Sequence, residues 1–563
     1  MRLKCFVVAV FCLCCVQASA QSFIQSLNQQ NHWVDSVFHS LSKKQKIAQL
    51  FMVRAHTNLG QAYEDSVGKV IKRQKLGGVV FFQGGPVREA ELINKYQKES
   101  KVPLLIAMDG EWGLGMRLDS TISYPYQMTL GAIRDNTLLY TMGRQIARDF
   151  KRLGVQMNFG PDMDVNNNPN NPVIGFRSFG DNKYNVAEKG IAYMRGMQDG
   201  GILTTAKHFP GHGDTEVDSH LDLPQLPFTR KRLDSLEEYP FREAIKAGIS
   251  GVMVAHMNIP ALDTTLHLPS TLSKPIITGI LKDSLGFKGL VVSDAMGMQG
   301  VVKFFPNGEA DVRAFIAGND LLELSQDSKR AIKMIKKAIR KGQIQMSDLD
   351  ARVKKVLTAK YWAGLNNRAT IPTQNMYQDL NHPDAKALVQ QLTDAAVTVL
   401  RKDSVAIDFG KRTAIISIGT NDTSIYQREL QKNFPSNSLF SIAKNAGKGK
   451  LDSLLQTLQN YDRVIIGVHD IRLRPASKLD FSDDVQLFIT QIAVKPNSVI
   501  SVFANPYSLA GLLGIEKAGT LIMGYQKSDE MQRSAVKVIT GQLKATGKLP
   551  VNVNVFFGYG VGL

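Results

Sequence analysis

The stretch KHFPGHGDTEVDSHLDLP, from Lys207 to Pro224, gathers histidines and carboxylates between helix-breaking residues. The small and apolar residues at 201–206 come directly before it and predict a buried strand. Pro210, Gly211 and Gly213 break any regular element after that strand, so we expect a long polar loop. Loops that carry titratable groups at the end of a strand are frequent functional sites. This loop is therefore the first candidate site, and the rest of the chain is expected to position it.

Short apolar runs alternate with amphipathic helical patterns over the first two thirds of the chain. Over 138–153, for example, apolar residues recur at helical spacing. Eight of the apolar runs are typical of buried strands: 47–53, 77–82, 102–108, 155–159, 202–206, 251–255, 290–292 and 320–324. Strands that alternate with helices in this number predict an α/β fold, a (β/α)8 TIM-type barrel.

Polar side chains follow consecutive strands of the predicted barrel, at the point where each strand ends. They are Asp109 after the third strand, Asp162 and Asp164 after the fourth, Lys207 and His208 after the fifth, His256 after the sixth and Asp294 after the seventh. In such a barrel these positions open onto one face, so the side chains are expected to meet around one pocket. A single strand-end Asp can also cap the following helix, but the repeated pattern favours a common site.

A polar stretch at 365–381, which contains Pro372, predicts a linker after the barrel. A second alternating series then predicts a smaller α/β sandwich, with a parallel sheet built from strands at 397–400, 414–418, 464–468, 499–503 and 520–523. The expected organisation is a signal peptide over 1–20, a barrel domain over 21–364, the linker over 365–381 and the sandwich domain over 382–563.

The first twenty residues have the pattern of a cleavable signal peptide. Arg2 and Lys4 precede an apolar run at 6–16, and Ala18-Ser19-Ala20 fits a cleavage site. The run is too short to span a bilayer, so we expect no integral membrane segment and an exported protein, either periplasmic or extracellular. All four cysteines lie in this segment. The mature chain would then have no disulfide, thiolate metal site or cysteine nucleophile.

A formal net charge of +18 raises the question of an anionic partner. The densest basic run, at 329–341, places Ile332, Ile335, Ala338 and Ile339 at helical spacing and its basic residues on the opposite face. Aromatic residues do not alternate with the basic ones. We interpret the run as a solvated helix and expect no nucleic-acid partner, although weak attraction to anionic envelope polymers is compatible with export.

The histidines of the loop do not have the spacing of a helical metal site. His208 and His212 are four residues apart, but Pro210 and Gly211 interrupt the turn between them. We therefore expect no metal and no other cofactor; a site that also uses Asp214 and His220 is the remaining metal alternative. A G-x-S-x-G motif, which would indicate a serine hydrolase, does not occur.

Asp218 and His220 offer a different chemistry. Residues two apart in an extended segment can point the same way, so the carboxylate can orient an imidazole that transfers protons near neutral pH. Asp294, in the sequence VVSDAMGM, adds a carboxylate from the seventh strand. A carboxylate nucleophile and a proton donor together can cleave a glycosidic bond.

Four motifs strengthen this interpretation: KHFPGHGDTEVDSH, VVSDAMGM, IGFRSFG at 174–180 and MDGEWG at 108–113. Together they resemble glycoside hydrolase family 3, and within it the bacterial β-N-acetylglucosaminidase branch. The resemblance implies that Asp294 is the nucleophile and that His220, held by Asp218, is the acid/base. It also implies a set of substrate-binding residues: Asp109, Arg117, Arg177, Lys207 and His208.

The function predicted from these features is that of an exported, retaining exo-β-N-acetylglucosaminidase acting on peptidoglycan fragments or related amino-sugar glycosides. Its expected partner is this carbohydrate substrate. Two enzymatic alternatives remain open, a glycosyl phosphorylase and a β-glucosidase of the same family. A wall-fragment-binding protein without activity is the alternative from another class.

Overall fold

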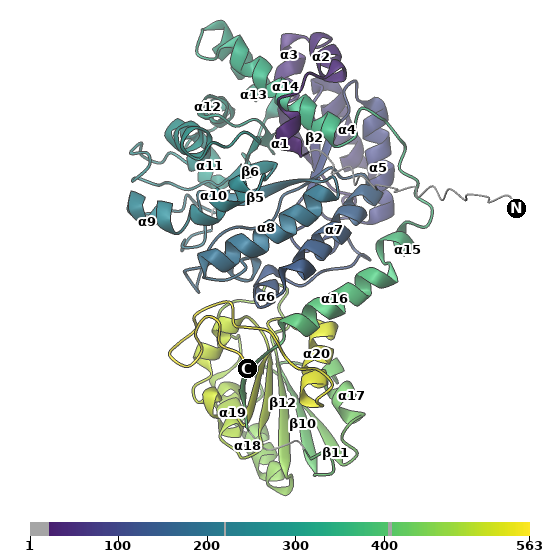
Figure 1. Ribbon diagram of the computed structural model, residues 1–563, viewed down its shortest axis with the longest axis vertical. Helices are drawn as coiled ribbons and strands as arrows, with labels where there is room; N and C mark the ends of the chain where they lie inside the picture. Colours follow the sequence, from purple (N-terminus) through teal and green to yellow (C-terminus); the bar gives the residue numbers. More distant parts are fainter. Residues whose placement is uncertain (1–21, 219–220, 404–407) are drawn as a thin grey trace, which may run out of the picture.

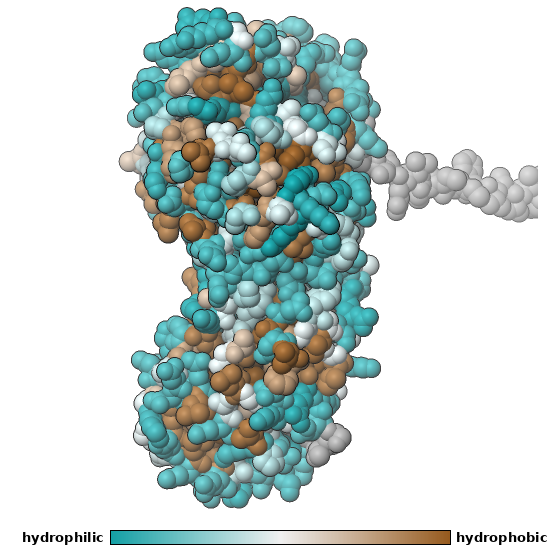
Figure 2. Space-filling model, turned by 90° about the vertical axis from the view of Figure 1, so that its left-hand side faces the viewer, coloured by the Kyte–Doolittle hydropathy of each residue, from teal (hydrophilic) through white to brown (hydrophobic). Residues whose placement is uncertain are grey.

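The computed structural model describes residues 22–218, 221–403 and 408–563 (Figure 1). The predicted signal peptide and His220 lie outside these ranges. A barrel with surrounding helices forms one part of the molecule and a second, smaller sheet forms the other. Figure 2 shows the two parts as lobes joined by a narrower, mostly hydrophilic waist. Within the described ranges, the helices are all too short or too polar to cross a membrane.

Eight parallel strands form the barrel, in the order β7-β6-β5-β4-β3-β2-β1-β8. A parallel bridge between Val292 and Leu321 brings the two ends of this order together. The predicted barrel is therefore confirmed. The strands are β1 (Phe51–Ala55), β2 (Gly78–Phe81), β3 (Leu105–Met108), β4 (Met157–Asn158), β5 (Leu203–Phe209), β6 (Gly251–Val254), β7 (Leu290–Ser293) and β8 (Leu322–Glu323).

Helices surround the barrel and bury their apolar faces against it. In α7 the buried residues Leu139, Met142, Ile146 and Phe150 have the helical spacing seen in the sequence. The main barrel helices are α4 (Gln61–Gln74), α5 (Pro86–Glu99), α7 (Asn136–Leu153), α8 (Lys183–Asp199), α10 (Tyr239–Lys246), the π-helix η4 (Pro275–Ser284), α12 (Glu309–Ala317), α13 (Ser328–Arg340) and α14 (Met346–Trp362).

Shorter helices complete the barrel. They are α1 (Phe23–Ser26), α2 (His32–His39), α3 (Lys43–Ala48), α6 (Gln127–Gly131), α9 (Arg230–Ser235), α11 (Gln299–Val302) and the single turns η1 (Leu114–Met116), η2 (Gly175–Arg177) and η3 (Ser270–Leu272). The basic helix α13 buries the predicted apolar stripe and exposes its lysines and arginines, as expected.

Several strand ends differ from the prediction, and the differences at β1 and β5 have a clear structural reason or consequence. The first strand was expected at 47–53 but lies at 51–55, because 43–48 forms α3. A capping box begins that helix: Ser42 Oγ accepts from the backbone N–H of Gln45, whose side chain accepts from the backbone N–H of Ser42. β5 is longer than expected and buries all seven of its residues, so Lys207 and His208 belong to the strand itself.

The second sheet has the order β11-β10-β12-β13-β14-β9. Its strands are β9 (Thr398–Lys402), β10 (Thr413–Ile418), β11 (Asn437–Ile442), β12 (Arg463–His469), β13 (Val499–Phe503) and β14 (Thr520–Met523). Its helices and turns are α16 (Pro383–Ala396), α17 (Ile425–Gln431), α18 (Lys448–Thr457), η5 (Leu458–Asn460), α19 (Asp483–Ala493), η6 (Pro506–Gly511), η7 (Ile515–Lys517) and α20 (Asp529–Ile539).

The expectation of a fully parallel second sheet was wrong for one strand. β9 runs antiparallel to β14, with Thr398 opposite Met523. The chain reaches β9 through α16, which lies at the junction with the barrel, so β9 starts at the edge where β14 ends (Figure 1). β11 was missed, because its sequence NSLFSI is mostly half-buried and lacks a continuous apolar run. A short helix, α15 (Met376–Leu380), lies within the predicted linker.

The loop that follows β4 makes several of the contacts between the barrel and the rest of the chain. The Tyr507 hydroxyl, from η6, donates to the backbone oxygen of Asn166 at 3.0 Å and accepts from Asn166 Nδ2 at 3.3 Å. Further along, Asp181 donates its backbone N–H to the Pro550 oxygen at 3.3 Å, and Asn552 donates to Asp181 Oδ2 at 2.6 Å. The chain's last residues thus pack against the barrel loop.

Removing the Tyr507 hydroxyl tests how much this junction contributes. Tyr507→Phe leaves two buried groups of Asn166 without that partner, so the free energy of unfolding should fall by about 1–3 kcal/mol. Tyr140→Phe is the matched control, because its hydroxyl bonds Asp199 on the surface and its loss should cost little. Urea denaturation of both variants measures the difference, and equal losses would contradict a stabilising role for the junction.

Candidate active site

One pocket of about 400 Å³ opens at the carboxyl ends of the barrel strands. Seven of the eight residues predicted from the sequence line it: Asp109, Arg117, Arg177, Lys207, His208, Asp218 and Asp294. The eighth, His220, lies outside the described residues. The loop around Pro169–Phe176 and the segment Arg474–Ser477 of the second sheet's part also line the pocket. Both parts of the molecule therefore build its wall.

Lys207 lies at the floor of the pocket between two carboxylates. Its Nζ is 2.9 Å from Asp109 Oδ1 and 2.8 Å from Glu111 Oε1. The lysine side chain is only 2% exposed and Glu111 is fully buried. A buried ammonium group needs such partners, since an unpaired charge in the interior is costly. β5 fixes the lysine, and the turn after β3 supplies both carboxylates.

Two arginines complete the charge balance of this floor. Arg117 Nη2 donates to Asp109 Oδ2 at 2.6 Å, and Arg177 donates to both Glu111 oxygens, through Nη2 at 2.6 Å and through Nε at 3.0 Å. Burial alone would raise the pKa of Glu111, but the Arg177 and Lys207 charges outweigh it and hold the pKa at about 2. Burial is likewise outweighed at Asp109, where Lys207 and Arg117 lower the pKa. Both carboxylates are therefore ionised.

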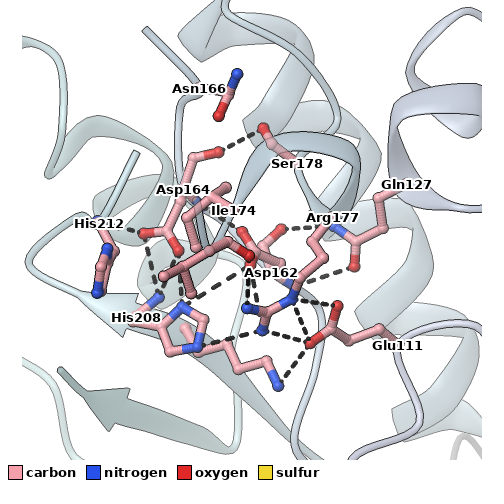
Figure 3. Close-up of polar contacts among 12 residues, drawn as sticks. Glu111, Gln127, Asp162, Asp164, Asn166, Ile174, Arg177, Ser178, His208 and His212 are labelled. Atoms are coloured by element: carbon pink, nitrogen blue, oxygen red, sulfur yellow. Dashed lines mark hydrogen bonds and ion pairs between the residues drawn. The ribbon is translucent and has the colours of Figure 1, made fainter. Parts of the chain in front are cut away.

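A second cluster lies beside this floor (Figure 3). Asp164 accepts from His208 Nδ1 at 2.7 Å and from the backbone N–H groups of His208 and His212. The other ring nitrogen of His208 contacts Arg177 Nη2 at 3.4 Å. Asp164 thus orients the imidazole of His208 toward the pocket and joins the start of the polar loop to the loop after β4.

His212 and His256 both have structural contacts, and His256 is not among the residues that line the pocket. His212 is buried, its Nδ1 lies 2.8 Å from Thr215 Oγ1, and burial lowers its pKa to about 4. His256 contacts Thr271 Oγ1 through Nδ1 at 2.7 Å and the Ala295 oxygen through Nε2 at 3.1 Å. His256 therefore packs behind the residue that follows Asp294.

Asp162, Asp164 and His208 have ligand atoms within 4.8 Å of one another, as a metal site would need. The arginine at this position competes with such an ion, because Arg177 Nη2 is 3.7 Å from Asp162 Oδ2. Burial and the charge of Asp164 also raise the pKa of Asp162 well above its usual range, which favours a neutral carboxyl group. Asp214, from the metal alternative predicted at the sequence level, forms an ion pair with Arg232.

Asp294 follows β7 directly and is partly exposed to the pocket. The Asp294 backbone N–H donates to Val254 of β6 at 3.0 Å, and Ala295 donates its N–H to Asp294 Oδ1 at 2.7 Å. The neighbouring strand thus fixes the backbone, and a local bond fixes the carboxylate. Asp218, on the polar loop, lines the same pocket.

Glu111 and Glu323 belong to the site although the sequence interpretation gave them no role in it. Glu111 had a usable signal, since it lies two residues after the strand-end Asp109. Glu323 lies on β8, within the apolar run expected as the eighth strand. It lines the pocket, and its Oε2 is buried with no hydrogen-bond partner among the described residues. Burial, together with Asp109 and Asp294, raises the Glu323 pKa well above its usual range.

Comparison with known proteins identifies the family. Residues 42–359 match the glycosyl hydrolase family 3 N-terminal domain, which is more than half of the chain. The chain belongs to glycosyl hydrolase family 3. It is therefore a glycoside hydrolase, and the family resemblance of its four motifs is confirmed.

Relatives of this glycoside hydrolase match over most of their length. Beta-hexosaminidase A of Pseudoalteromonas piscicida is 28% identical, and the match covers 87% of this chain and 91% of the relative. A beta-N-acetylglucosaminidase/beta-glucosidase of Cellulomonas fimi is 24% identical, with 92% and 95% covered. The structure of a glycoside hydrolase family 3 beta-N-acetylglucosaminidase from Paenibacillus sp. str. FPU-7 aligns with a TM-score of 0.77 at 30% identity, over 92% of this chain and 99% of that one.

The ion-paired floor predicts a large effect of removing one of its charges. Glu111→Gln leaves Arg177 and Lys207 buried with one carboxylate fewer, so the free energy of unfolding should fall by roughly 3 kcal/mol. Asp119→Asn is the matched control, because Asp119 pairs with Arg88 on the surface. Denaturant unfolding of the two variants tests this, and similar losses in both would show that the floor is not a coupled network.

The raised pKa of Glu323 predicts a pH-dependent stability. Below the usual pKa, about 4.5, the folded and unfolded states are both protonated. Above it only the unfolded state ionises, so stability falls as the pH rises toward the folded-state pKa. Glu323→Gln keeps the shape and removes this effect, so the variant should gain stability relative to the wild type as the pH rises above about 4.5.

Unfolding free energies of both proteins at several pH values in this range measure that gain. Glu309→Gln, at an exposed helical position, serves as the control and should follow the wild type. A constant difference between Glu323→Gln and the wild type would mean that Glu323 is ionised in the folded protein.

Proposed function

We propose that this family 3 enzyme is an exported, retaining exo-β-N-acetylglucosaminidase that acts on peptidoglycan fragments or related amino-sugar glycosides. One observation carries the proposal: the Asp294 carboxylate and the Asp218 loop meet at a pocket whose floor already holds paired charges. The names of the relatives from P. piscicida, C. fimi and Paenibacillus support a substrate with a terminal N-acetylhexosamine. The predicted signal peptide supports export to the periplasm or the medium.

In the proposed first step, an Asp294 oxygen attacks the anomeric carbon of the sugar while His220 gives its proton to the departing glycosidic oxygen. The aglycone leaves as an alcohol and a covalent glycosyl-enzyme remains. In the second step, His220 takes a proton from water, the water oxygen attacks the anomeric carbon, and Asp294 is released. Asp218 orients the imidazole and stabilises its charge during both steps.

The floor binds the sugar in this scheme. Asp109 accepts hydrogen bonds from hydroxyl groups, and Lys207, Arg117 and Arg177 donate to their oxygens. The ring nitrogen of His208 that is not bonded to Asp164 can donate or accept. Hydrogen bonds among these side chains hold them in place before the substrate arrives, so binding costs little side-chain conformational entropy. A pocket that ends in a packed floor suits one terminal sugar and thus an exo-acting enzyme.

Replacing the proposed nucleophile tests the assignment. Asp294→Ala should lower kcat for 4-nitrophenyl N-acetyl-β-D-glucosaminide by roughly 1000-fold or more, because no covalent intermediate can form. Asp35→Ala, at a half-exposed surface position that pairs with Lys354, is the matched control and should keep full activity. Equal activity of the two variants would remove Asp294 from the mechanism.

Analysis of the products tests the retaining stereochemistry and the phosphorylase and β-glucosidase alternatives. A retaining enzyme first releases the β-anomer, which proton NMR during turnover detects, whereas initial release of the α-anomer would contradict the covalent step. Formation of a sugar 1-phosphate in phosphate buffer would identify a phosphorylase. Faster cleavage of the corresponding glucoside would identify a β-glucosidase.

A further inference from the structure

The segment 470–478, between β12 and α19, crosses from the second sheet to the barrel pocket. Four of its residues line that pocket: Arg474, Pro475, Ala476 and Ser477. The segment follows the carboxyl end of β12, and Ser477 Oγ reaches the barrel loop at Asn170 Oδ1, 3.3 Å away. The wall of the pocket is therefore shared between two distant regions of the chain.

Hydrogen bonds hold the backbone of this segment on both sides of Arg474. Lys527 Nζ donates to the Ile471 oxygen at 3.0 Å, and the Tyr126 hydroxyl donates to the Leu473 oxygen at 3.0 Å. Asn505 Nδ2 donates to the Pro475 oxygen at 3.4 Å. Arg472 pairs with Asp470 through two bonds, at 2.8 Å and 2.7 Å, and also donates to the Lys478 oxygen at 2.7 Å.

Arg474 differs from the cations at the pocket floor in its partners. Arg117, Arg177 and Lys207 each pair with a carboxylate there. The exposed Arg474 side chain has no carboxylate partner among residues 22–218, 221–403 and 408–563. Its backbone is fixed while its guanidinium group is available to a ligand.

Arg54 is the other exposed cation of the pocket, and its surroundings are different. Its guanidinium group stacks over the Phe82 ring, 4.7 Å from the centroid. It also lies near enough to the buried Glu323 for their charges to interact. The charge of Arg54 is therefore used at the barrel side of the pocket, and Arg474 is the cation on the side of the second sheet.

Aromatic rings lie next to the segment that carries Arg474. Trp112 and Phe176 line the pocket, with centroids 6.0 Å apart, and Tyr126 packs against both, at 4.9 Å and 4.8 Å. The Tyr126 hydroxyl is the group that bonds the Leu473 oxygen. Half-buried rings at a pocket wall suit the apolar face of a sugar, so the wall near Arg474 combines aromatic side chains with a cation.

We propose that Arg474 recognises a carboxylate on the leaving group of the substrate, so that the enzyme prefers acidic over neutral aglycones. This inference rests on the proposed function, in which the terminal sugar occupies the buried floor and the leaving group points toward the pocket mouth. A guanidinium group matches a carboxylate with two parallel hydrogen bonds, which gives direction as well as charge.

The test uses two disaccharides with equal bulk at the leaving group. One is N-acetylglucosaminyl-β-(1→4)-N-acetylmuramic acid, and the other is the same compound with its lactyl carboxylate converted to the amide. Their Kd values are measured by titration calorimetry in the Asp294→Ala background, which keeps the substrate intact. Adding Arg474→Ala should lower the preference for the acid over the amide about tenfold, to near one.

Lys478→Ala is the matched control, because Lys478 is an exposed cation of the same segment that does not line the pocket. The preference should persist in this variant and should shrink when the ionic strength rises from about 0.05 M to about 0.5 M. An unchanged preference in the Arg474→Ala protein overturns the proposal. A preference that disappears with Arg54→Ala instead also overturns it.

Turnover by the wild-type protein is measured separately with the nitrophenyl substrate. Absent turnover together with an Arg474-dependent preference in binding would refute the hydrolase proposal and keep the carboxylate site. Normal turnover together with equal binding of acid and amide by all proteins would support the hydrolase proposal and refute the carboxylate site.

Discussion

The buried ammonium group of Lys207 is the constraint on which this site depends. With only 2% of its side chain exposed, it requires carboxylates within contact distance, and Asp109 and Glu111 supply them. Those carboxylates in turn need Arg117 and Arg177 for their remaining oxygens. Each charged group is therefore stabilised by its neighbours, and removal of any one of them leaves an uncompensated charge in the buried interior.

In the proposed mechanism, this arrangement assists binding and catalysis. Donors and acceptors that are fixed before the substrate arrives need little reorganisation when it binds. The barrel supplies much of that rigidity, because Lys207 lies on β5 and both of its carboxylate partners lie on the turn directly after β3. The proposed proton donor, by contrast, belongs to the polar stretch 207–224 and not to this ion-paired floor.

The second sheet contributes to the same pocket through the carboxyl ends of its strands. Ligands of parallel sheets commonly bind at this edge. Here the edge faces the barrel, and the segment after β12 delivers Arg474 to the barrel's pocket. The second sheet, whose carboxyl edge is of a kind that often binds ligands itself, thus extends the pocket of the barrel.

The fold and much of the site could be predicted from the sequence because the signal is local. Each barrel strand is a short apolar run, and each strand-end residue follows it directly, so topology alone brings Asp109, Lys207 and Asp294 together. The edge strand β11 gave no such signal, because half-buried strands lack a continuous apolar run. Glu323 lies at a strand end as well, but a lone carboxylate there is more often structural.

Arg474 could not be found in this way. It lies in a polar segment without a motif, and only the docking of the second sheet places it beside residues far away in the sequence. Long-range contacts of this kind depend on how two surfaces fit together. Local residue patterns in the sequence do not predict that fit.

The contact of the last residues with the loop after β4 has a consequence for biosynthesis. Arg177 lies on that loop, and Asp181, four residues later, is bonded to Pro550 and Asn552. A ribosome makes Pro550 and Asn552 long after it makes Arg177 and Asp181. The loop that carries Arg177 therefore obtains these contacts only after the strands of the second sheet have been synthesised.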